Sequence, residues 1–365
     1  MRWRHLLTTG ILLPLVVAAL PGTGPGTGPA RGATASDATP MTSVSVASAN
    51  LREGSAVRHR ADMRDGDDRA AFVRRLLRNG ARPPDVILLQ EVLGSAGTVA
   101  RTLTRHPRAQ RTRTRYVVAV APRRTVQRGH CDGPRSGRYS TLRDSAILVN
   151  TSTVRAVNAR GAVRTWGRWR AEGATRMGRG GYGCAEQPWV RVTVRQPGRQ
   201  QRTARIMSSH VAPVDTRLKS RAIGHIAESM AAKHRRTPTD LVVVGGDLNQ
   251  LPSRAGHRSL RRAGFHDAVR RLNPTGPDGV AGVQRRIDFI YTNAHARRSG
   301  FDRCYLAFHV QRDRCIAKRA VFPDAARFFR CQIRSLHHGA PADTCRRGAY
   351  RAYYSDHPIL WATLQ

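Results

Sequence analysis

Residues 241–252 have the sequence LVVVGGDLNQLP, in which a short apolar run leads through two glycines to an aspartate and an asparagine. Four consecutive apolar residues before turn residues are typical of a strand that is buried on both faces. The stretch therefore predicts a buried strand, residues 241–244, that delivers the polar side chains of Asp247 and Asn249 at its carboxyl end.

The same pattern recurs along the chain, where an apolar strand gives way to a carboxylate, an amide or an imidazole. One such residue alone is weak evidence for a functional site, because an asparagine after a strand commonly forms a turn and a glutamate there commonly lies on the surface. Strand ends at one edge of a sheet converge, however, so recurring polar ends can share one pocket. The residues that follow the pattern are Asn50, Gln90, Glu91, His210, Asp247, Asn249, Asp288, Asp356 and His357.

Hydrophobic periodicity predicts mainly strands, with helices over residues 67–79 and 217–234. The segments 123–143 and 156–187 are rich in arginine and glycine, and we expect them to be long basic loops. Strands with a few helices and irregular connections imply a layered α/β fold and not a regular parallel βαβ repeat. We expect strands over residues 41–50, 86–89, 116–121, 146–149, 190–194, 204–209, 241–244, 287–291 and 359–364.

The first residues of the chain have the pattern of an export signal. Arg2 and Arg4 precede an apolar region, Leu6–Leu20, and small residues at Ala33 and Ala35 suit a signal peptidase. A membrane anchor would need about 20 unbroken apolar residues, and this run is shorter. We therefore expect residues 1–35 to be a signal peptide and spacer, and the protein to be secreted.

Six cysteines are consistent with an oxidising compartment and with up to three disulfide bonds. Because no C-x-x-C pair occurs, a zinc site is disfavoured. Proximity in sequence favours pairing of Cys131 with Cys184, which leaves the last four cysteines to pair among themselves. The six are Cys131, Cys184, Cys304, Cys315, Cys331 and Cys345.

The formal net charge of +39 is extreme for 365 residues, and all but three of the 63 basic residues are arginines. A protein this basic attracts polyanions, such as nucleic acid, or anionic lipid surfaces. A charged surface that serves solubility alone is the alternative.

The polar strand ends fit the cleavage of a phosphate ester. A hard cation such as Mg²⁺, or Mn²⁺ or Ca²⁺, takes oxygen ligands, and Glu91 and Asn50 offer a carboxylate and a carbonyl. A metal ion stabilises the leaving oxygen of such a reaction, and an imidazole paired with a carboxylate helps to activate a water molecule. His210 and His357 are the two imidazoles of the set, and the amide of Asn249 can donate to a phosphate oxygen.

Six motifs in order resemble the endonuclease/exonuclease/phosphatase superfamily, which includes the pancreatic-type deoxyribonucleases. The resemblance implies a four-layer α/β (α+β) sandwich, in which helices flank two mixed β-sheets, over residues 41–365. A cysteine-rich insertion at about residues 300–350 departs from a simple nuclease of this family. The motifs are SANL (48–51), DVILLQEV (85–92), SSHVAP (208–213), GGDLNQLP (245–252), RRIDFIY (285–291) and YSDHPIL (354–360).

The resemblance also implies a role for each motif residue. Glu91 is similar to the main metal ligand and Asn50 to the amide beside it. Asp247 resembles the acid that orients or activates the attacking water, and Asn249 resembles the amide that contacts phosphate.

The remaining motif residues resemble two imidazoles and their acids. His357 resembles the imidazole at the scissile phosphate, and Asp288 the carboxylate that orients it. Asp356 resembles an acid near the metal. His210 resembles the second imidazole of the deoxyribonuclease-like and sphingomyelinase-like branches.

A polyanionic substrate suits the charge, so the sequence favours a secreted nuclease that acts on DNA or RNA. A sphingomyelinase-like phospholipid phosphodiesterase at an anionic lipid surface is the first alternative, and a phosphomonoesterase is the second. A non-catalytic basic protein that binds nucleic acid is a third. No protein partner is evident from the sequence, and we expect a monomer.

Overall fold

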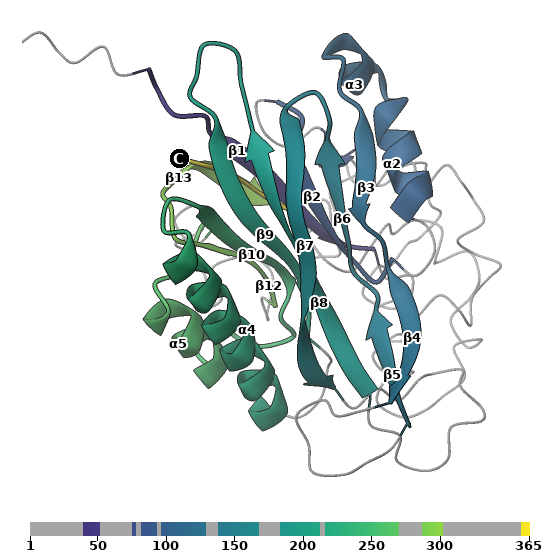
Figure 1. Ribbon diagram of the computed structural model, residues 1–365, viewed down its shortest axis with the longest axis vertical. Helices are drawn as coiled ribbons and strands as arrows, with labels where there is room; N and C mark the ends of the chain where they lie inside the picture. The colour runs from purple at the N-terminus through teal and green to yellow at the C-terminus, as the bar shows by residue number, and fades with distance from the viewer. Residues whose placement is uncertain are drawn as a thin grey trace, which may run out of the picture. The chain divides into compact units, whose positions relative to one another are not determined.

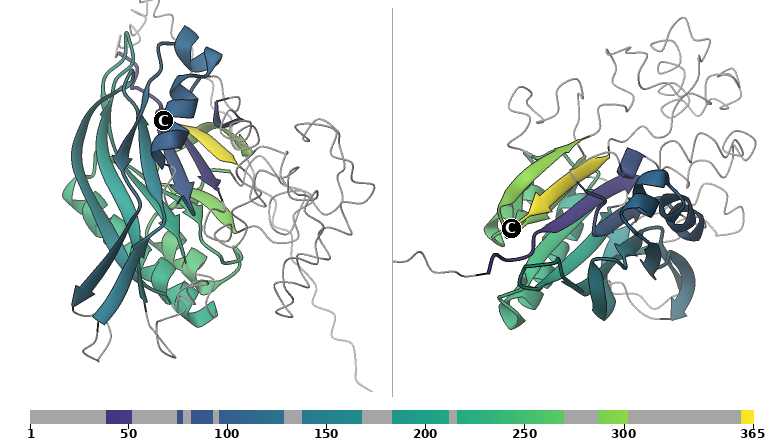
Figure 2. Two further views of the ribbon diagram at one scale, coloured as in Figure 1. Left: turned by 90° about the vertical axis from the view of Figure 1, so that its right-hand side faces the viewer. Right: turned by 90° about the horizontal axis from the view of Figure 1, so that it is seen from above.

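Two mixed β-sheets packed face to face carry the structure, and helices cover the outer side of each sheet (Figures 1 and 2). The computed structural model describes residues 39–51, 75–77, 82–92, 96–128, 138–167, 183–211, 216–269, 287–301 and 359–365. This arrangement confirms the four-layer sandwich expected from the motifs.

The smaller sheet has six strands in the order β13-β14-β1-β2-β6-β3. Strands β1 and β2 run parallel, and β14 and β6 flank this pair in the antiparallel direction. The helices α2 (Ala96–Thr104) and α3 (Pro107–Arg111) follow β2 in the chain. The strands are β1 (Val44–Asn50), β2 (Val86–Gln90), β3 (Tyr116–Val120), β6 (Ala146–Asn150), β13 (Ala296–Phe301) and β14 (Leu360–Leu364).

The larger sheet has eight strands in the order β11-β12-β10-β9-β8-β5-β4, with β7 paired to β8. The helices α4 (Thr216–Arg236) and α5 (Ala255–Arg262) lie on its outer face. No helix in the described part of the chain is long and apolar enough to cross a membrane. The strands are β4 (Arg123–Arg128), β5 (Arg138–Arg143), β7 (Val154–Gly167), β8 (Gly183–Val194), β9 (Arg202–His210), β10 (Leu241–Asp247), β11 (His266–Asp267) and β12 (Asp288–Thr292).

Alternation along each central strand divides its side chains between two apolar cores. In β10, Leu241 and Val243 point into the core between the sheets, whereas Val242 and Val244 pack on the side of α4. In β2, Val86 and Leu88 face the other sheet, and Ile87 and Leu89 face α2. Both faces of these strands are therefore buried, which explains why their sequences are continuous apolar runs.

The expectation of long basic loops is wrong where the structure describes those segments. Residues 123–128 and 138–143 form the antiparallel pair β4–β5, and residues 156–167 and 183–187 belong to β7 and β8. In β7, for example, the exposed Arg164 lies between the buried Val163 and Thr165. A strand with one exposed face does not need a continuous apolar run. The arginines on that face therefore made the sequence resemble a loop.

Several other predictions fall on residues that the structure does not describe. The predicted helix 67–79 is represented by residues 75–77, in which Arg75 and Leu76 are helical. The insertion after Phe301 lies outside the described residues. So do all the cysteines except Cys184, whose backbone is part of β8. The disulfide bonds therefore stay predictions.

The two glycines of the opening motif meet two different close neighbours. A Cβ on Gly245 would lie 2.6 Å from Leu88 Cδ1 of the facing sheet. Gly246 has a φ of +139°, and a Cβ there would lie 1.9 Å from the backbone oxygen of Ser209. Only glycine adopts that conformation without strain, so this pair lets β10 approach both neighbours just before Asp247.

Substitution of Gly246 by alanine is expected to lower the free energy of unfolding by about 3 kcal/mol, because it adds backbone strain and a clash with β9. Urea denaturation measures the loss. Gly198→Ala is the matched control, since Gly198 also has a positive φ of +66° but has nothing within 4 Å of an added Cβ. The control should cost about 1 kcal/mol, and equal losses in the two variants would contradict the clash.

Candidate active site

The inner faces of both sheets become polar at one common edge. In β1 the inward residues run from Val44 and Val46 to Ser48 and Asn50. In β10 they run from Leu241 and Val243 to Gly245 and Asp247. The strand register sets His210 beside Asp247, and Asp288 beside Asp247 on its other side. The polar residues therefore end the apolar core and share its edge.

Asn50 connects the two sheets at this edge. Its Nδ2 donates to Glu91 Oε1 at 2.8 Å, in its own sheet, and to Asp247 Oδ2 at 3.2 Å, in the facing sheet. Asn50 and Asp247 are almost completely buried, whereas Glu91 is partly exposed. The amide thus holds two carboxylates close together despite their like charge.

A second polar bridge lies one step deeper between the sheets. Gln90 Nε2 donates to Ser208 Oγ at 2.9 Å, and Ser48 Oγ donates to Gln90 Oε1 at 3.4 Å. Ser208 Oγ in turn donates to the backbone oxygen of Leu89 at 3.1 Å. These buried groups satisfy one another, and they join β1 and β2 to β9 directly below the site.

His210 is held between three carboxylates. Its Nδ1 donates to Asp144 Oδ2 at 2.5 Å. Its Nε2 lies 3.7 Å from Glu91 Oε1 and 3.9 Å from Asp247 Oδ2. The ring therefore has a fixed orientation, with Asp144 behind it and the Glu91–Asp247 pair in front.

The carboxylates raise the pKa of His210 to about 10 in the metal-free protein. Burial is the largest single influence and by itself lowers the pKa, because it penalises the charged ring. The charge and hydrogen bond of Asp144 oppose burial, and the charges of Glu91 and Asp247 add to them. Without a metal ion, His210 is thus an imidazolium that balances part of the acidic charge around it.

Gln187 holds the backbone of His210 from the neighbouring strand. Its Oε1 accepts from His210 N at 2.7 Å, and its Nε2 donates to the backbone oxygen of His210 at 3.0 Å. The β8–β9 ladder ends at Trp189 and Met207, so the side chain of Gln187 supplies bonds that a strand partner would otherwise make. His210 is therefore fixed both at its ring and at its backbone.

The loop after β10 is built around Asp247 and Asn249. Asn249 N donates to Asp247 Oδ1 at 2.7 Å, and Asn249 Nδ2 donates to the backbone oxygen of Val211 at 2.9 Å. The buried His257 fixes the next turn, since its Nε2 donates to the oxygen of Gln250 at 2.8 Å and its Nδ1 accepts from Tyr291 at 2.9 Å. His257 thus has a structural role in this loop.

Two site residues adopt left-handed backbone conformations. Glu91 has a φ of 51° and Asn249 a φ of 49°. Asparagine tolerates this region, but a glutamate there carries strain, which structures commonly retain at functional sites. The turn at Glu91 is held by Val92 N, which donates to the backbone oxygen of Asp144 at 2.8 Å.

The donors at this edge fit a divalent cation. Glu91, His210 and Asp247 each place one ligand atom within 4.8 Å of the others, and no other such group of acids, histidines or cysteines occurs in the described ranges. Carboxylate oxygens suit Mg²⁺, Mn²⁺ and Ca²⁺. Because these hard cations prefer oxygen to imidazole nitrogen, the oxygen atoms of Glu91 and Asp247 are better ligands for them than Nε2 of His210.

The structure brings together five of the eight residues to which the family motifs assign a role, through hydrogen bonds or close ion-pair distances: Asn50, Glu91, His210, Asp247 and Asn249. Asp288 lies beside Asp247 by register, but it begins β12 and does not end a strand as expected. Asp356 and His357 lie outside the described residues, so their roles stay predictions from the motif.

Sequence reasoning missed Asp144 and Gln187, the two residues that hold His210. Asp144 precedes the apolar run of β6, and Gln187 precedes that of β8. The sequence pattern considered only residues at the carboxyl ends of strands, so it did not include either residue. Because β6 is antiparallel to β2, and β8 to β9, the start of each lies at the edge where its neighbour ends. An acid just before a strand is the signal that would have found Asp144.

A family model for the endonuclease/exonuclease/phosphatase family matches residues 47–357, which include every motif residue of the site. The chain belongs to this family. Members of the family are hydrolases that act on phosphoester bonds. No curated protein sequence matches the chain.

Several solved structures are similar to this one at low sequence identity. The endonuclease/exonuclease/phosphatase family protein from Bacteroides thetaiotaomicron is 16% identical with a TM-score of 0.47, over 88% of this chain and 97% of that chain. The human Nocturnin catalytic domain with bound sulfate is 13% identical with a TM-score of 0.48, over 88% and 93%. The D. rerio TDP2 complex with single-strand DNA product is 14% identical with a TM-score of 0.44, over 89% and 99%.

In metal-free protein, the ring of His210 is expected to carry both protons at about pH 8, because three carboxylates surround it. Ring ¹⁵N NMR shifts of the wild type and of Asp144→Asn measure this, and the variant should titrate at a lower pH. Since the folded pKa of about 10 lies above the ordinary 6.5, the ion pair stabilises the fold fully below about pH 6.5. That contribution is lost as the pH rises through about 10. A wild-type ring that titrates near 6.5 would contradict the arrangement.

Proposed function

We propose that the protein is a divalent-metal-dependent phosphodiesterase that hydrolyses nucleic acid. One observation carries the proposal: Asn50 joins Glu91 of one sheet to Asp247 of the other, with the fixed ring of His210 facing both carboxylates. This set offers oxygen ligands for a cation, an acceptor for a water molecule and a hydrogen-bond donor for a phosphate oxygen. Membership in a family of phosphoester hydrolases supports the same chemistry.

Each residue contributes a distinct function in the proposed reaction. A divalent ion, held by Glu91 with Asn50 beside it, would offset phosphate charge and stabilise the leaving oxygen. Asp247 is buried and accepts hydrogen bonds from Asn50 and Asn249, so its carboxylate is oriented to position the attacking water. His210 presents Nε2 toward the same point and stabilises negative charge that develops on the phosphate.

Asp144 and Gln187 act in this proposal as positioning residues, because both act through His210. The motif residues His357 and Asp356 complete the proposed set, with Asp288 as the orienting acid for His357. These three assignments come from the family motif.

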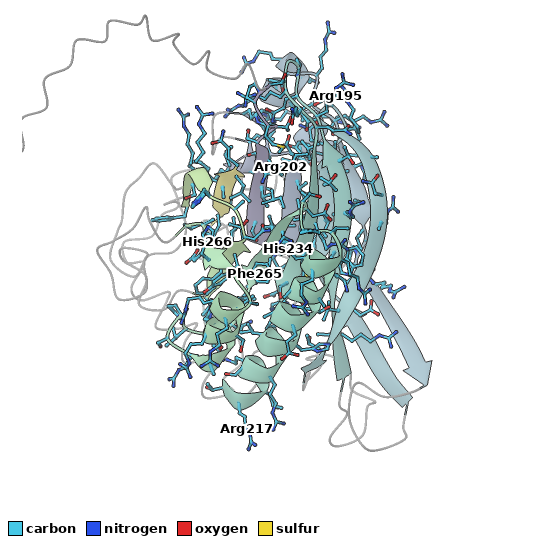
Figure 3. All side chains as sticks on the ribbon, turned by 60° about the vertical axis from the view of Figure 1, so that its left-hand side comes forward. Arg195, Arg202, Arg217, His234, Phe265 and His266 are labelled. Carbon is cyan, nitrogen blue, oxygen red and sulfur yellow. The ribbon has the colours of Figure 1, made fainter. Side chains whose placement is uncertain are left out.

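The charge of the molecule supports nucleic acid as the substrate. Basic side chains project from the described surface, as Arg217 does at the lower end of the view in Figure 3. A long polyanion gains from many such contacts, whereas a small phosphomonoester gains from few. The formal charge of +39 therefore favours a polymeric substrate.

Glu91→Gln is expected to lower the hydrolysis of supercoiled plasmid at least about 100-fold, because it removes the main carboxylate ligand while keeping the shape of the side chain. EDTA should abolish wild-type cleavage, and Mg²⁺ or Mn²⁺ should restore it. Glu228→Gln is the matched control, since Glu228 is exposed on α4 and should leave the rate unchanged.

Single-stranded RNA and sphingomyelin, assayed beside the plasmid, separate the possible substrates. Cleavage of sphingomyelin without cleavage of either nucleic acid would replace the proposed substrate with a phospholipid. Full activity of Glu91→Gln, or cleavage that EDTA leaves intact, would overturn the metal-dependent mechanism.

We further propose that the protein is exported, on the basis of the charged and apolar segments in residues 1–35. Expression of the full chain in a bacterial host, followed by amino-terminal sequencing of protein from the medium, tests this. The mature chain is expected to begin near Ala35, whereas full-length protein retained in the cell would contradict export.

A further inference from the structure

Three arginines from three strands converge on one buried glutamate next to the site. Arg123 donates to both carboxylate oxygens of Glu186 at 3.0 to 3.1 Å, and Arg143 Nη2 donates to Oε2 at 2.5 Å. Arg164 Nε lies 3.7 Å from Oε1. The side chain of Glu186 is only 2% exposed, whereas those of Arg123 and Arg164 are 47% and 50% exposed.

Two neighbours in the chain place this cluster beside the catalytic groups. Arg143 directly precedes Asp144, whose Oδ2 accepts from His210 Nδ1, and Glu186 directly precedes Gln187, whose side chain bonds the backbone of His210. Asp247 lies on the other side of His210, in β10. Arg164 pairs directly with Glu186.

All of these side chains point to the same side of the large sheet. Glu186 alternates with Val190 and Val192, and His210 alternates with Ala204 and Ile206, whose side chains all enter the core between the sheets. Continued by one position, the β5–β8 register sets Arg143 beside Glu186, and Arg123 pairs with Arg143. The guanidinium groups of both arginines meet at Glu186.

One carboxylate cannot neutralise three guanidinium groups, so the cluster keeps a formal excess of two positive charges. Arg143 is 11% exposed and its Nε has no hydrogen-bond partner, and burial lowers the pKa of this arginine. Glu186 holds Arg123 through a bidentate contact. The side chain of Arg123 is therefore already ordered, which lowers the entropy cost of binding an anion. The outward N–H groups of Arg123 and Arg164 are thus presented in fixed positions to an anion.

We infer that Arg123, Arg143 and Arg164, ordered by Glu186, form a binding site for a backbone phosphate that neighbours the scissile phosphate. This inference rests on the proposed function and specifies how the substrate is oriented. A nucleic-acid strand bound along this edge of the sheet would place one phosphate among His210, Glu91 and Asp247, and a neighbouring phosphate on the arginines. Arg164 and Arg123 bind phosphate oxygens through their fork of donors, as guanidinium groups do.

Binding of a fluorescein-labelled single-stranded oligonucleotide to the full chain, in EDTA to prevent cleavage, tests the inference. Arg123→Ala and Arg164→Ala should each weaken binding about tenfold at about 50 mM salt. Each should also reduce the slope of log affinity against log salt by about one, as expected for one lost phosphate contact. Arg164→Lys keeps the charge, so it should retain the wild-type slope.

Arg195→Ala is the matched control, because Arg195 is exposed just beyond the opposite end of β8, about 30 Å from Glu186 along the strand. Its affinity should stay within about twofold of the wild type. Equal losses in the control and in the cluster variants would show that only net charge matters, and would overturn the site. So would wild-type affinity and slope in both Arg123→Ala and Arg164→Ala.

The same assay separates this inference from the proposed function. Wild-type protein that hydrolyses bis(p-nitrophenyl) phosphate with Mg²⁺ but fails to bind the oligonucleotide would refute nucleic acid as the substrate, and the site with it. Wild-type binding that the cluster variants leave unchanged would refute the site alone. Melting temperatures of all variants confirm that each is folded. If Arg123→Ala does not fold, the half-exposed and loosely paired Arg164 decides the outcome.

Discussion

The hydrogen bonds of Asn50 to Glu91 and to Asp247 connect the two sheets at the place where the chemistry is proposed to occur. Each sheet supplies one carboxylate, and neither could hold the other in place without a donor between them. The spacing of the site therefore depends on how the sheets pack against each other. Any shift of one sheet along the other would separate the carboxylates and remove the cation site.

The packing of the two sheets is set by apolar side chains in the core between them and by small residues next to the site. The core between the sheets consists mainly of valine, leucine and isoleucine, and it gives way to Ser48, Gln90 and Ser208 one step below the site. Gly245 admits Leu88 of the facing sheet, and Gly246 admits the backbone of β9. The buried polar bridge is tolerated because its members satisfy one another, and it specifies a single relative position of the sheets.

The large sheet carries opposite charge on the two sides of His210. On one side of His210 lie Asp247 and Asp288, which favour a cation. On the other side lie Arg143, Arg123 and Arg164 around Glu186, which favour an anion. A chain with a formal charge of +39 thus places acids together where a metal is expected. Under the proposed function, the arginines would bind the substrate, and this division of charge would orient a bound polyanion.

The sequence alone determined the family, the two apolar sheets and the residues at the carboxyl ends of parallel strands. Asn50, Glu91, His210 and Asp247 were recognisable because an apolar run stops abruptly at each of them. The tertiary structure decided which strands run antiparallel, and therefore which residues at strand starts reach the same edge. Asp144, Glu186 and Gln187 belong to this second group. The strands β4, β5 and β7 were mistaken for loops because their sequences are rich in arginine and lack a continuous apolar run. Strand direction is set by long-range pairing, which no local pattern of residues encodes.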